Sequence, residues 1–349
     1  MKVLLLAPSY LELYKPILDT MRNMGHDVTY IEDITPPFYP YYKRGFLNGL
    51  LYRTYNIFKN IDYLYKQYWD AIIKEYHLQD YRYDVFFCIN GTSLHQYFIN
   101  FIDRNNPKIF KTMYLWDTNK YYDFARFIKC FHKVFTFDFA DSKELSVNYL
   151  PFYYLENKNV LRTFKYDAFC IGSLHDNRLA ILDEISKQLD SYSLTYIFKV
   201  VYVPIRNTIK NEIRYYLSFL INDKVERDER KYKMGLLKHK LLTTTIYPVD
   251  VYNELMHECK VIIDTDRQSQ AGLTPRLVWA IASGKNIITT NSNIVKDPYC
   301  PQDGIWIIDR NKPQITKEMF KNNREYVLTD KFEKLEIHQW ICNFVQNND

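Results

Sequence analysis

Short apolar runs alternate with longer amphipathic stretches along most of the sequence, and this alternation limits the possible fold more than any other feature. The apolar runs have the length of buried strands, and the stretches between them have the length and spacing of helices. Strands that alternate with helices form βα units, which build parallel sheets covered by helices. The sequence therefore predicts an α/β fold with parallel sheets.

The predicted strands fall into two series. The first series comprises 2–7, 27–31, 84–89, 109–115 and 133–137, with a helix over 11–24 between its first two strands. The pattern breaks at 149–154, and the second series follows at 168–171, 195–201, 243–247, 261–264, 286–290 and 305–308. A chain of 349 residues is longer than one core normally uses, so we expect two domains. Their predicted bounds are 1–155 and 156–329, followed by a C-terminal segment, 330–349, whose helix crosses back to the first domain.

Composition narrows the class of protein. With 47% hydrophobic and 25% charged residues, the chain has ample material for buried cores, which excludes global disorder. The net charge of +5 is dispersed among nearly as many acidic residues, so no nucleic acid is expected as a partner. Six cysteines without a CxxC pair or zinc spacing fit a reduced, cytoplasmic compartment. No apolar run is long enough to span a membrane.

In open α/β sheets, ligands bind beyond the carboxyl ends of the strands, where loop amides and helix N-termini converge. The loop 170–178 follows a strand, and its glycine lets the backbone approach a ligand. His175 and Arg178 in this loop could add charge for a diphosphate. An ordinary turn capped by Asp176 or Asn177 is an alternative that the sequence leaves open.

A second polar loop, 264–276, follows the strand 261–264. Thr274 and Pro275 have the residue types expected at the start of a helix over 275–283. Capping does not explain the polar run that precedes them, which comprises Asp264, Asp266, Arg267, Gln268 and Gln270. We therefore expect this loop to hold phosphate or sugar hydroxyls.

Two residues in the first series are candidate general bases. Asp117 follows the strand 109–115, and a carboxylate at a strand end can take the proton of a sugar hydroxyl. His95 in the loop 90–95 is the second candidate, although a lone histidine there is more often a structural hydrogen-bond partner. Asp141 is expected to cap the helix after 133–137. Nothing has metal-ligand spacing, so neither a metal nor another cofactor is expected.

These loops resemble those of a known family. The segments that carry the resemblance are YLWD (114–117), FTFD (135–138), YLPFY (149–153), FCIGSLH (169–175) with Arg178, and QAGLTPR (270–276) followed by GKNIITTN (284–291). They resemble bacterial glycosyltransferases of lipopolysaccharide, O-antigen and capsule biosynthesis, in the CgeB-like group. The resemblance implies the GT-B architecture, two Rossmann-like domains with parallel sheets facing an interdomain cleft. It also implies a metal-independent enzyme, with a nucleotide-sugar donor on the C-terminal domain and the acceptor on the N-terminal domain.

The resemblance also implies a set of donor-binding residues: Gly172, Ser173, His175, Arg178, Tyr247, Gln270, Gly272, Leu273, Thr274 and Arg276. Among these, Arg276 would support the loop and Tyr247 would lie near the nucleotide base. One position departs from the family pattern. Trp279 stands where a glutamate commonly binds the donor ribose, so it indicates either altered donor binding or core packing, and both remain open.

The expected function is transfer of a sugar from a nucleotide-sugar donor to a hydroxyl of a glycan or glycolipid acceptor. We expect this acceptor to be lipid-linked and to become part of a surface glycan. The basic, aromatic stretch 39–59 would contact the anionic inner face of the plasma membrane, making the protein peripheral there. The alternative for 39–59 is aromatics in a core and charges in solvent. Two other functions stay open: a nucleotide-sugar epimerase on the same fold, and a catalytically silent nucleotide- or carbohydrate-binding protein.

Overall fold

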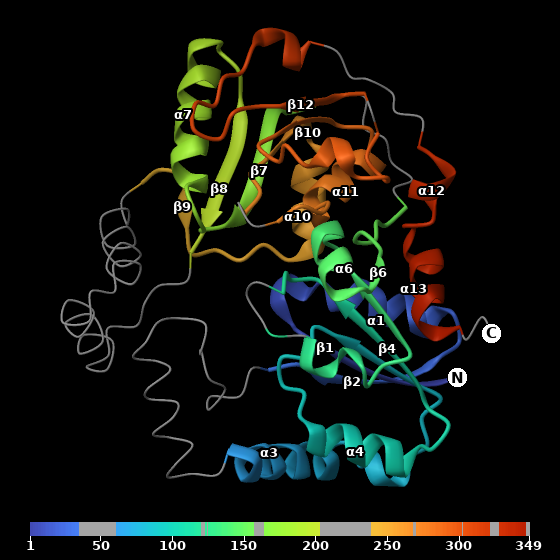
Figure 1. Ribbon diagram of the computed structural model, residues 1–349. Helices are drawn as coiled ribbons and strands as arrows, with labels where there is room; N and C mark the ends of the chain where they lie inside the picture. Colours follow the sequence, from blue (N-terminus) through green and yellow to red (C-terminus); the bar gives the residue numbers. More distant parts are fainter. Residues whose placement is uncertain are drawn as a thin grey trace, which may run out of the picture.

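The computed structural model contains two six-stranded sheets (Figure 1). It describes residues 1–34, 61–119, 123, 125–156, 164–202, 239–267, 270–301, 303–321 and 328–346. The strand orders are β2-β1-β3-β4-β5-β6 in the first sheet and β12-β11-β10-β7-β8-β9 in the second. All strand pairs of the described residues run parallel. The predicted α/β fold with two parallel sheets is therefore confirmed.

The strands lie close to the predicted ranges. The first sheet contains β1 Lys2–Ala7, β2 Asp27–Glu32, β3 Val85–Ile89, β4 Phe110–Leu115, β5 Lys133–Thr136 and β6 Asn148–Tyr149. The second sheet contains β7 Tyr166–Ser173, β8 Tyr196–Val201, β9 Leu242–Thr243, β10 Cys259–Asp264, β11 Asn286–Thr289 and β12 Ile305–Ile307. The strand predicted at 243–247 is limited to the two residues of β9, which pair with Val200 and Val201 at the end of β8. The two-residue strand β6 was not predicted.

The α-helices connect and cover these strands. They are α1 Tyr14–Asn23, α3 Ile61–Glu75, α4 Gln96–Asn105, α5 Ala125–Ile128, α6 Phe139–Leu145, α7 Arg178–Ser191, α10 Val249–His257, α11 Pro275–Ala282, α12 Asp330–Glu333 and α13 Ile337–Val345. The helix predicted over 11–24 begins later, at α1, because Leu11 and Glu12 have left-handed φ angles of 52° and 58°. The stretch 39–59 lies outside the described residues. None of the described helices has the length and hydrophobicity that a membrane crossing requires.

The first sheet is covered on both faces. Alternate residues of β1, β3 and β4 pack against α3 and α4 on one face, while the other set faces α1 and α13. The helix α13 lies beside α1 and against β3 and β4 (Figure 1). The Thr112 hydroxyl in β4 donates a hydrogen bond of 3.1 Å to the Phe344 carbonyl in α13. The end of the chain thus contributes to the core of the first sheet.

A single hydrophobic cluster extends from the first sheet into the second. Its centre is an aromatic seam formed by Phe152, Tyr153, Trp279 and Trp340. The indole N–H of Trp279 donates to the Tyr153 carbonyl, and that of Trp340 donates to the Pro151 carbonyl, each at 3.0 Å. Of the two interpretations of Trp279, the structure supports core packing, since its ring is buried and its one polar atom is bonded.

The carboxylate of Asp138 joins the two sheets through backbone hydrogen bonds. Its Oδ1 accepts from the N–H groups of Ala140 and Asp141, at 2.8 and 3.2 Å, and so caps α6. Its Oδ2 accepts from the N–H groups of Ala271 and Gly272, at 2.6 and 3.2 Å, in the loop after β10. The cap predicted at Asp141 was therefore misplaced, because the β5 turn puts Asp138 at the first free amides of α6.

Replacing Gly272 by alanine should destabilise this junction. A Cβ at position 272 would lie 2.0 Å from the Phe137 carbonyl oxygen and 2.8 Å from the Asp138 Cα, both backbone atoms that cannot rotate away. We expect Gly272→Ala to lower the free energy of unfolding by about 3 kcal/mol. Urea unfolding measures this loss.

Gly25→Ala is the matched control for the glycine substitution. Position 25 has a φ of 83° and no atom within 4 Å of the added Cβ, so only backbone strain of about 1 kcal/mol is expected there. Equal losses in the two variants would contradict the close contact at Gly272.

Asp297 should make stability depend on pH. It accepts hydrogen bonds from the Tyr149 hydroxyl on β6 and from the Tyr299 N–H, and burial raises its pKa from 3.8 to about 6. Because the folded state binds the proton more tightly, this stability is present below about pH 4 and is lost as pH rises through 6. Between pH 4 and 7 the wild type should lose about 2 kcal/mol relative to Asp297→Asn.

Unfolding free energies measured across that range, for wild type and variant, test the effect of Asp297. Asp309→Asn is the control. Asp309 also accepts a hydrogen bond from the N–H of the residue two positions later, Asn311, but its side chain is exposed. Its pH profile should parallel the wild type. A parallel profile for Asp297→Asn would show that Asp297 does not cause the pH dependence.

Candidate functional site

The candidate site lies where the carboxyl ends of the two sheets meet. The loops after β7 and β10 bring His175, Arg178 and Arg267, and the loop after β4 brings Asp117. The charge of Arg267 acts on Asp117 across the junction, as well as on His175 and Arg178. The predicted loops of the two series are thus neighbours in space.

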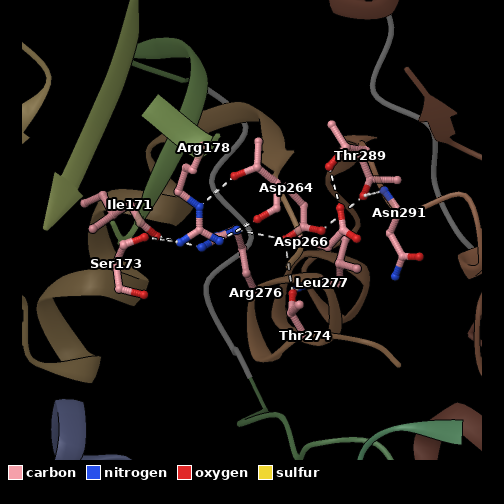
Figure 2. Close-up of polar contacts among 12 residues, drawn as sticks. Ile171, Ser173, Arg178, Asp264, Asp266, Thr274, Arg276, Leu277, Thr289 and Asn291 are labelled. Atoms are coloured by element: carbon pink, nitrogen blue, oxygen red, sulfur yellow. Dashed lines mark hydrogen bonds and ion pairs between the residues drawn. The ribbon is translucent and has the colours of Figure 1, made fainter. Parts of the chain in front are cut away.

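Asp264 organises the second-sheet side of the site (Figure 2). It is fully buried at the end of β10. Its Oδ1 accepts from Arg276 Nη1 at 2.7 Å and from the Thr274 hydroxyl at 3.1 Å, and its Oδ2 accepts from the Thr289 hydroxyl at 3.0 Å. One carboxylate therefore connects β10, the start of α11 and the end of β11.

Arg276 connects the loops of the candidate site from within the core. Besides Asp264, its guanidinium donates to the Tyr252 hydroxyl and to the Ile171 carbonyl at the end of β7, at 3.1 and 2.9 Å. Burial acts to lower the pKa of Arg276, but Tyr252 and Asp264 outweigh that effect and raise it. Arg276 is thus a fixed cation with protein partners on all three nitrogens.

Arg178 is a buried cation without a paired carboxylate. It lies at the first position of α7 and donates to the Thr265 hydroxyl, the Thr265 carbonyl and the Ser173 carbonyl (Figure 2). No carboxylate of the described residues forms an ion pair with it. Burial and the nearby Arg276 lower the pKa of Arg178 to about 10, so it remains charged at neutral pH. A buried positive charge of this kind favours an anion nearby.

His175 adds a neutral group beside this charge. Burial, with the charges of Arg178 and Arg267, lowers the pKa of His175 to about 3, against a smaller opposite effect of Asp176. Its Nδ1 is buried and lies 3.4 Å from an Asp176 oxygen, without the geometry of a good hydrogen bond. A buried polar atom that is poorly satisfied is costly, which makes His175 a suitable hydrogen-bonding group for a ligand.

Asp117 presents a second carboxylate to this junction from the first-sheet side, besides that of Asp138. The side-chain amide of Asn90 donates to its Oδ2 at 2.7 Å, while its Oδ1 has no hydrogen-bond donor within the described part of the chain. Burial raises the pKa of Asp117, and the Asn90 hydrogen bond and the Arg267 charge act against that rise. A carboxylate with one held and one available oxygen is suited to accept a proton.

His95, the other candidate base, has partners on both ring nitrogens. Its Nδ1 accepts from the Tyr97 N–H at 3.2 Å as the N-cap of α4, and its Nε2 lies 3.1 Å from an Asp62 oxygen. Its ring also stacks on Tyr65. These contacts are those of a structural histidine, the alternative raised by the sequence.

The remaining predicted donor residues mainly shape the loops. Gly172 lets Arg178 and Arg276 approach, because a Cβ there would lie 2.4 and 2.6 Å from their nitrogens. Leu273 is buried in the shared core, and Thr274 caps α11 as predicted by accepting from the Leu277 N–H. The others contact their surroundings as follows: Ser173 offers its carbonyl to Arg178, the Gln270 N–H donates to the Arg267 carbonyl, the Gly272 N–H binds Asp138, and Tyr247 packs half-buried ahead of α10.

Three residues important to the site were not among the candidate site residues predicted from the sequence. Asp138 holds the 271–272 amides, Asn90 holds Asp117, and Asp33 holds the loop after β3. Each one follows a strand within two residues, so the rule that picked out Asp117 could have found them. No cluster of His, Cys, Asp or Glu side chains suitable for a metal ion occurs among the described residues.

No protein-family model and no curated protein matches the sequence. Solved structures of similar arrangement include a UDP-forming α,α-trehalose-phosphate synthase from Burkholderia xenovorans. It shares 11% sequence identity with this chain, the match covers 98% of this chain and 94% of that chain, and the TM-score is 0.49. MnaA of S. aureus, solved with UDP, has 10% identity, coverages of 88% and 84%, and a TM-score of 0.43. The lipopolysaccharide outer core galactosyltransferase WaaB has 8% identity, coverages of 99% and 92%, and a TM-score of 0.38.

The class of protein follows from the chain's own topology. Two successive domains with parallel sheets, joined at the carboxyl ends of their strands, make this a two-domain α/β protein. The polar groups of the candidate site come from both domains.

Removing the charge of Asp264 should be strongly destabilising. In Asp264→Asn the buried guanidinium of Arg276 would lose its carboxylate, and breaking a buried pair from one side costs about 3–5 kcal/mol. Urea unfolding of the variant measures the loss. Glu12→Gln, which breaks the exposed pair with Lys15, is the control and should change stability little. Equal stability of the two variants would contradict a central role for Asp264.

Proposed function

We propose that this protein is a glycosyltransferase that moves a sugar from a nucleotide-sugar donor to a hydroxyl group of a glycan or glycolipid acceptor. The observation that carries the proposal is the buried cation Arg178, which has no paired carboxylate among the described residues and lies near Arg267, whose charge acts on the carboxylate of Asp117. Positive charge on one domain suits a diphosphate, and a carboxylate on the other suits a hydroxyl nucleophile.

The donor diphosphate would lie against the loops after β7 and β10. Arg178 and Arg267 provide positive charge there, and the neutral imidazole of His175 provides a hydrogen bond. The N–H groups of Ala271 and Gly272 are bonded to Asp138, so the diphosphate would depend on side chains more than on these two amides. Positive charge placed before the reaction stabilises the leaving group as its bond to the sugar breaks.

In the proposed reaction, the sugar passes from the donor to the acceptor hydroxyl at the junction between the domains. An acceptor hydroxyl oxygen bonds to the anomeric carbon, and the bond from that carbon to the diphosphate oxygen breaks. The hydroxyl proton passes to Asp117 Oδ1, and the electron pair of the broken bond leaves with the nucleoside diphosphate. Asp117 fits this role because its other oxygen is held by Asn90.

A catalytically silent nucleotide-binding protein is the second candidate. It is favoured by Trp279, which occupies the position of a common ribose-binding glutamate but belongs to the aromatic seam. On this alternative a nucleotide binds and no sugar is transferred.

Binding of the nucleotide part of the donor should raise the melting temperature of the protein. Screening UDP, GDP, CMP and TDP should identify at least one that stabilises the fold by about 3 kcal/mol at a hundredfold excess over its Kd. Arg267→Ala should weaken that nucleotide about tenfold or more through loss of a charged contact, and the exposed Arg104→Ala should not. No shift with any nucleotide would contradict a nucleotide-sugar donor.

Transfer itself separates the two candidate functions. The assay uses sugar donors that carry the nucleotide found to stabilise the fold. In this assay Asp117→Asn should reduce sugar transfer about 100-fold or more while leaving nucleotide binding intact. Full transfer by the variant would remove Asp117 from the mechanism. Nucleotide binding without transfer by the wild type would favour the silent protein, and turnover of donor without an acceptor would favour an epimerase.

A lipid-linked acceptor of the lipopolysaccharide, O-antigen or capsule type extends this proposal. It rests on the sequence resemblance and on the basic, aromatic stretch 39–59, which lies outside the described residues. Cosedimentation with anionic vesicles and not with neutral ones would support a membrane contact.

A further inference from the structure

The side chain of Asn90 links the ends of two neighbouring strands. Its Oδ1 accepts from the Trp116 N–H at 2.9 Å, and its Nδ2 donates to Asp117 Oδ2 at 2.7 Å. Asn90 itself is buried, with 2% of its surface exposed. The first contact fixes the amide so that its N–H group, and not its oxygen, faces the carboxylate.

The backbone at Asn90 is held in an unusual conformation. Its φ is 61°, in the left-handed region that asparagine tolerates better than most residues. The backbone N–H of Asn90 donates to the Tyr114 carbonyl at 2.9 Å, which ties the turn to β4. Left-handed residues at strand ends persist where the surroundings hold them, and they are frequent at functional sites.

Asp33 holds the rest of this loop. Its Oδ2 accepts from the N–H and hydroxyl of Thr92, at 2.7 and 3.0 Å, and its Oδ1 accepts from the N–H and hydroxyl of Ser93, at 2.8 and 2.6 Å. Asp33 is buried beyond β2, so four hydrogen bonds anchor the loop from the far side of β1. The loop that carries Asn90 is therefore rigid at both ends.

We infer that Asn90 is the positioning residue for Asp117, and that Asp33 anchors the loop that presents it. The inference rests on the proposed role of Asp117 as the base. The Asn90 amide binds one carboxylate oxygen and leaves Oδ1 facing the acceptor. It also stabilises the ionised form, because its N–H donates to the negative oxygen.

Besides this hydrogen bond, two influences act on the pKa of Asp117 in opposite directions. Burial favours its protonated form, and the Arg267 charge, from the loop after β10, favours its ionised form. Among the described residues, Arg267 is the charged group that lowers the pKa of Asp117. The amide of Asn90 therefore matters for keeping the base ionised at neutral pH.

The substitution Asn90→Asp tests the inference directly. It keeps the side-chain shape, the acceptor for the Trp116 N–H and the tolerance for a left-handed φ, but it replaces the donor with a second carboxyl. Two carboxyl groups in contact share a proton, so the apparent pKa of Asp117 should rise by about 1–3 units. Carbon-13 NMR of labelled aspartate carboxyls, assigned with Asp117→Asn, measures this pKa without any substrate. The acidic limb of kcat/KM for sugar transfer should move by the same amount, with activity recovering at higher pH.

Asn106→Asp is the matched control. Asn106 is also buried, and its side chain also accepts a backbone N–H, that of Tyr83 at 2.7 Å, while its amide donates to the Ile102 carbonyl at 3.0 Å. It precedes β4, at the opposite end of the strand from Asp117. This variant should lose stability but leave the Asp117 titration unchanged.

An Asp117 carboxyl that titrates alike in wild type and Asn90→Asp, with the fold intact, would overturn the inference. So would an equal shift in Asn106→Asp. If Asn90→Asp does not fold, Asn90→Ser removes the donated amide with a smaller group, and its Asp117 pKa must also rise. Absence of sugar transfer by the wild type would count against the proposed function alone, because the NMR titration still measures the action of Asn90 on Asp117.

Discussion

The carboxylate of Asp138 is the interaction on which the arrangement of the molecule depends. It accepts hydrogen bonds from four backbone N–H groups, two at the start of α6 and two in the loop after β10. The residues it joins, Asp138 and Ala271, are 133 positions apart in the sequence. Backbone amides cannot move without their chain, so this one side chain fixes how the ends of the two sheets face each other. The hydrogen bonds of Asp138 therefore also determine the distance between the charged groups that the two sheets contribute to the candidate site.

Packing reinforces the same junction. The aromatic seam buries large rings from the segment after β6, from α11 and from α13 in one continuous core. Interiors of this kind are dense and deform little. The relative position of Asp117 and Arg267 is thus set by buried side chains as well as by the hydrogen bonds that Asp138 accepts from both loops.

The sequence predicted the strands well, because apolar runs of strand length are a local property. It predicted the loops of the site through a topological rule, that ligands gather beyond strand ends. It could not predict which polar groups would be used up by the protein itself. Arg178 and Gly272 looked available in the sequence, yet their partners, Thr265 and Asp138, come from distant segments. Strand order and the role of Trp279 depend on the same long-range contacts.

The position of α13 has a consequence for how the chain acquires its structure. This helix covers β3 and β4 of the first sheet, and its Trp340 fills the seam beside Phe152. During synthesis the strands emerge long before the helix that shields them. The apolar face of the first sheet must therefore stay exposed, or be covered by a chaperone, until translation has passed residue 345. The core of the first sheet is completed only when α13 has been made, and a ribosome that stops before residue 337 would release an aggregation-prone intermediate.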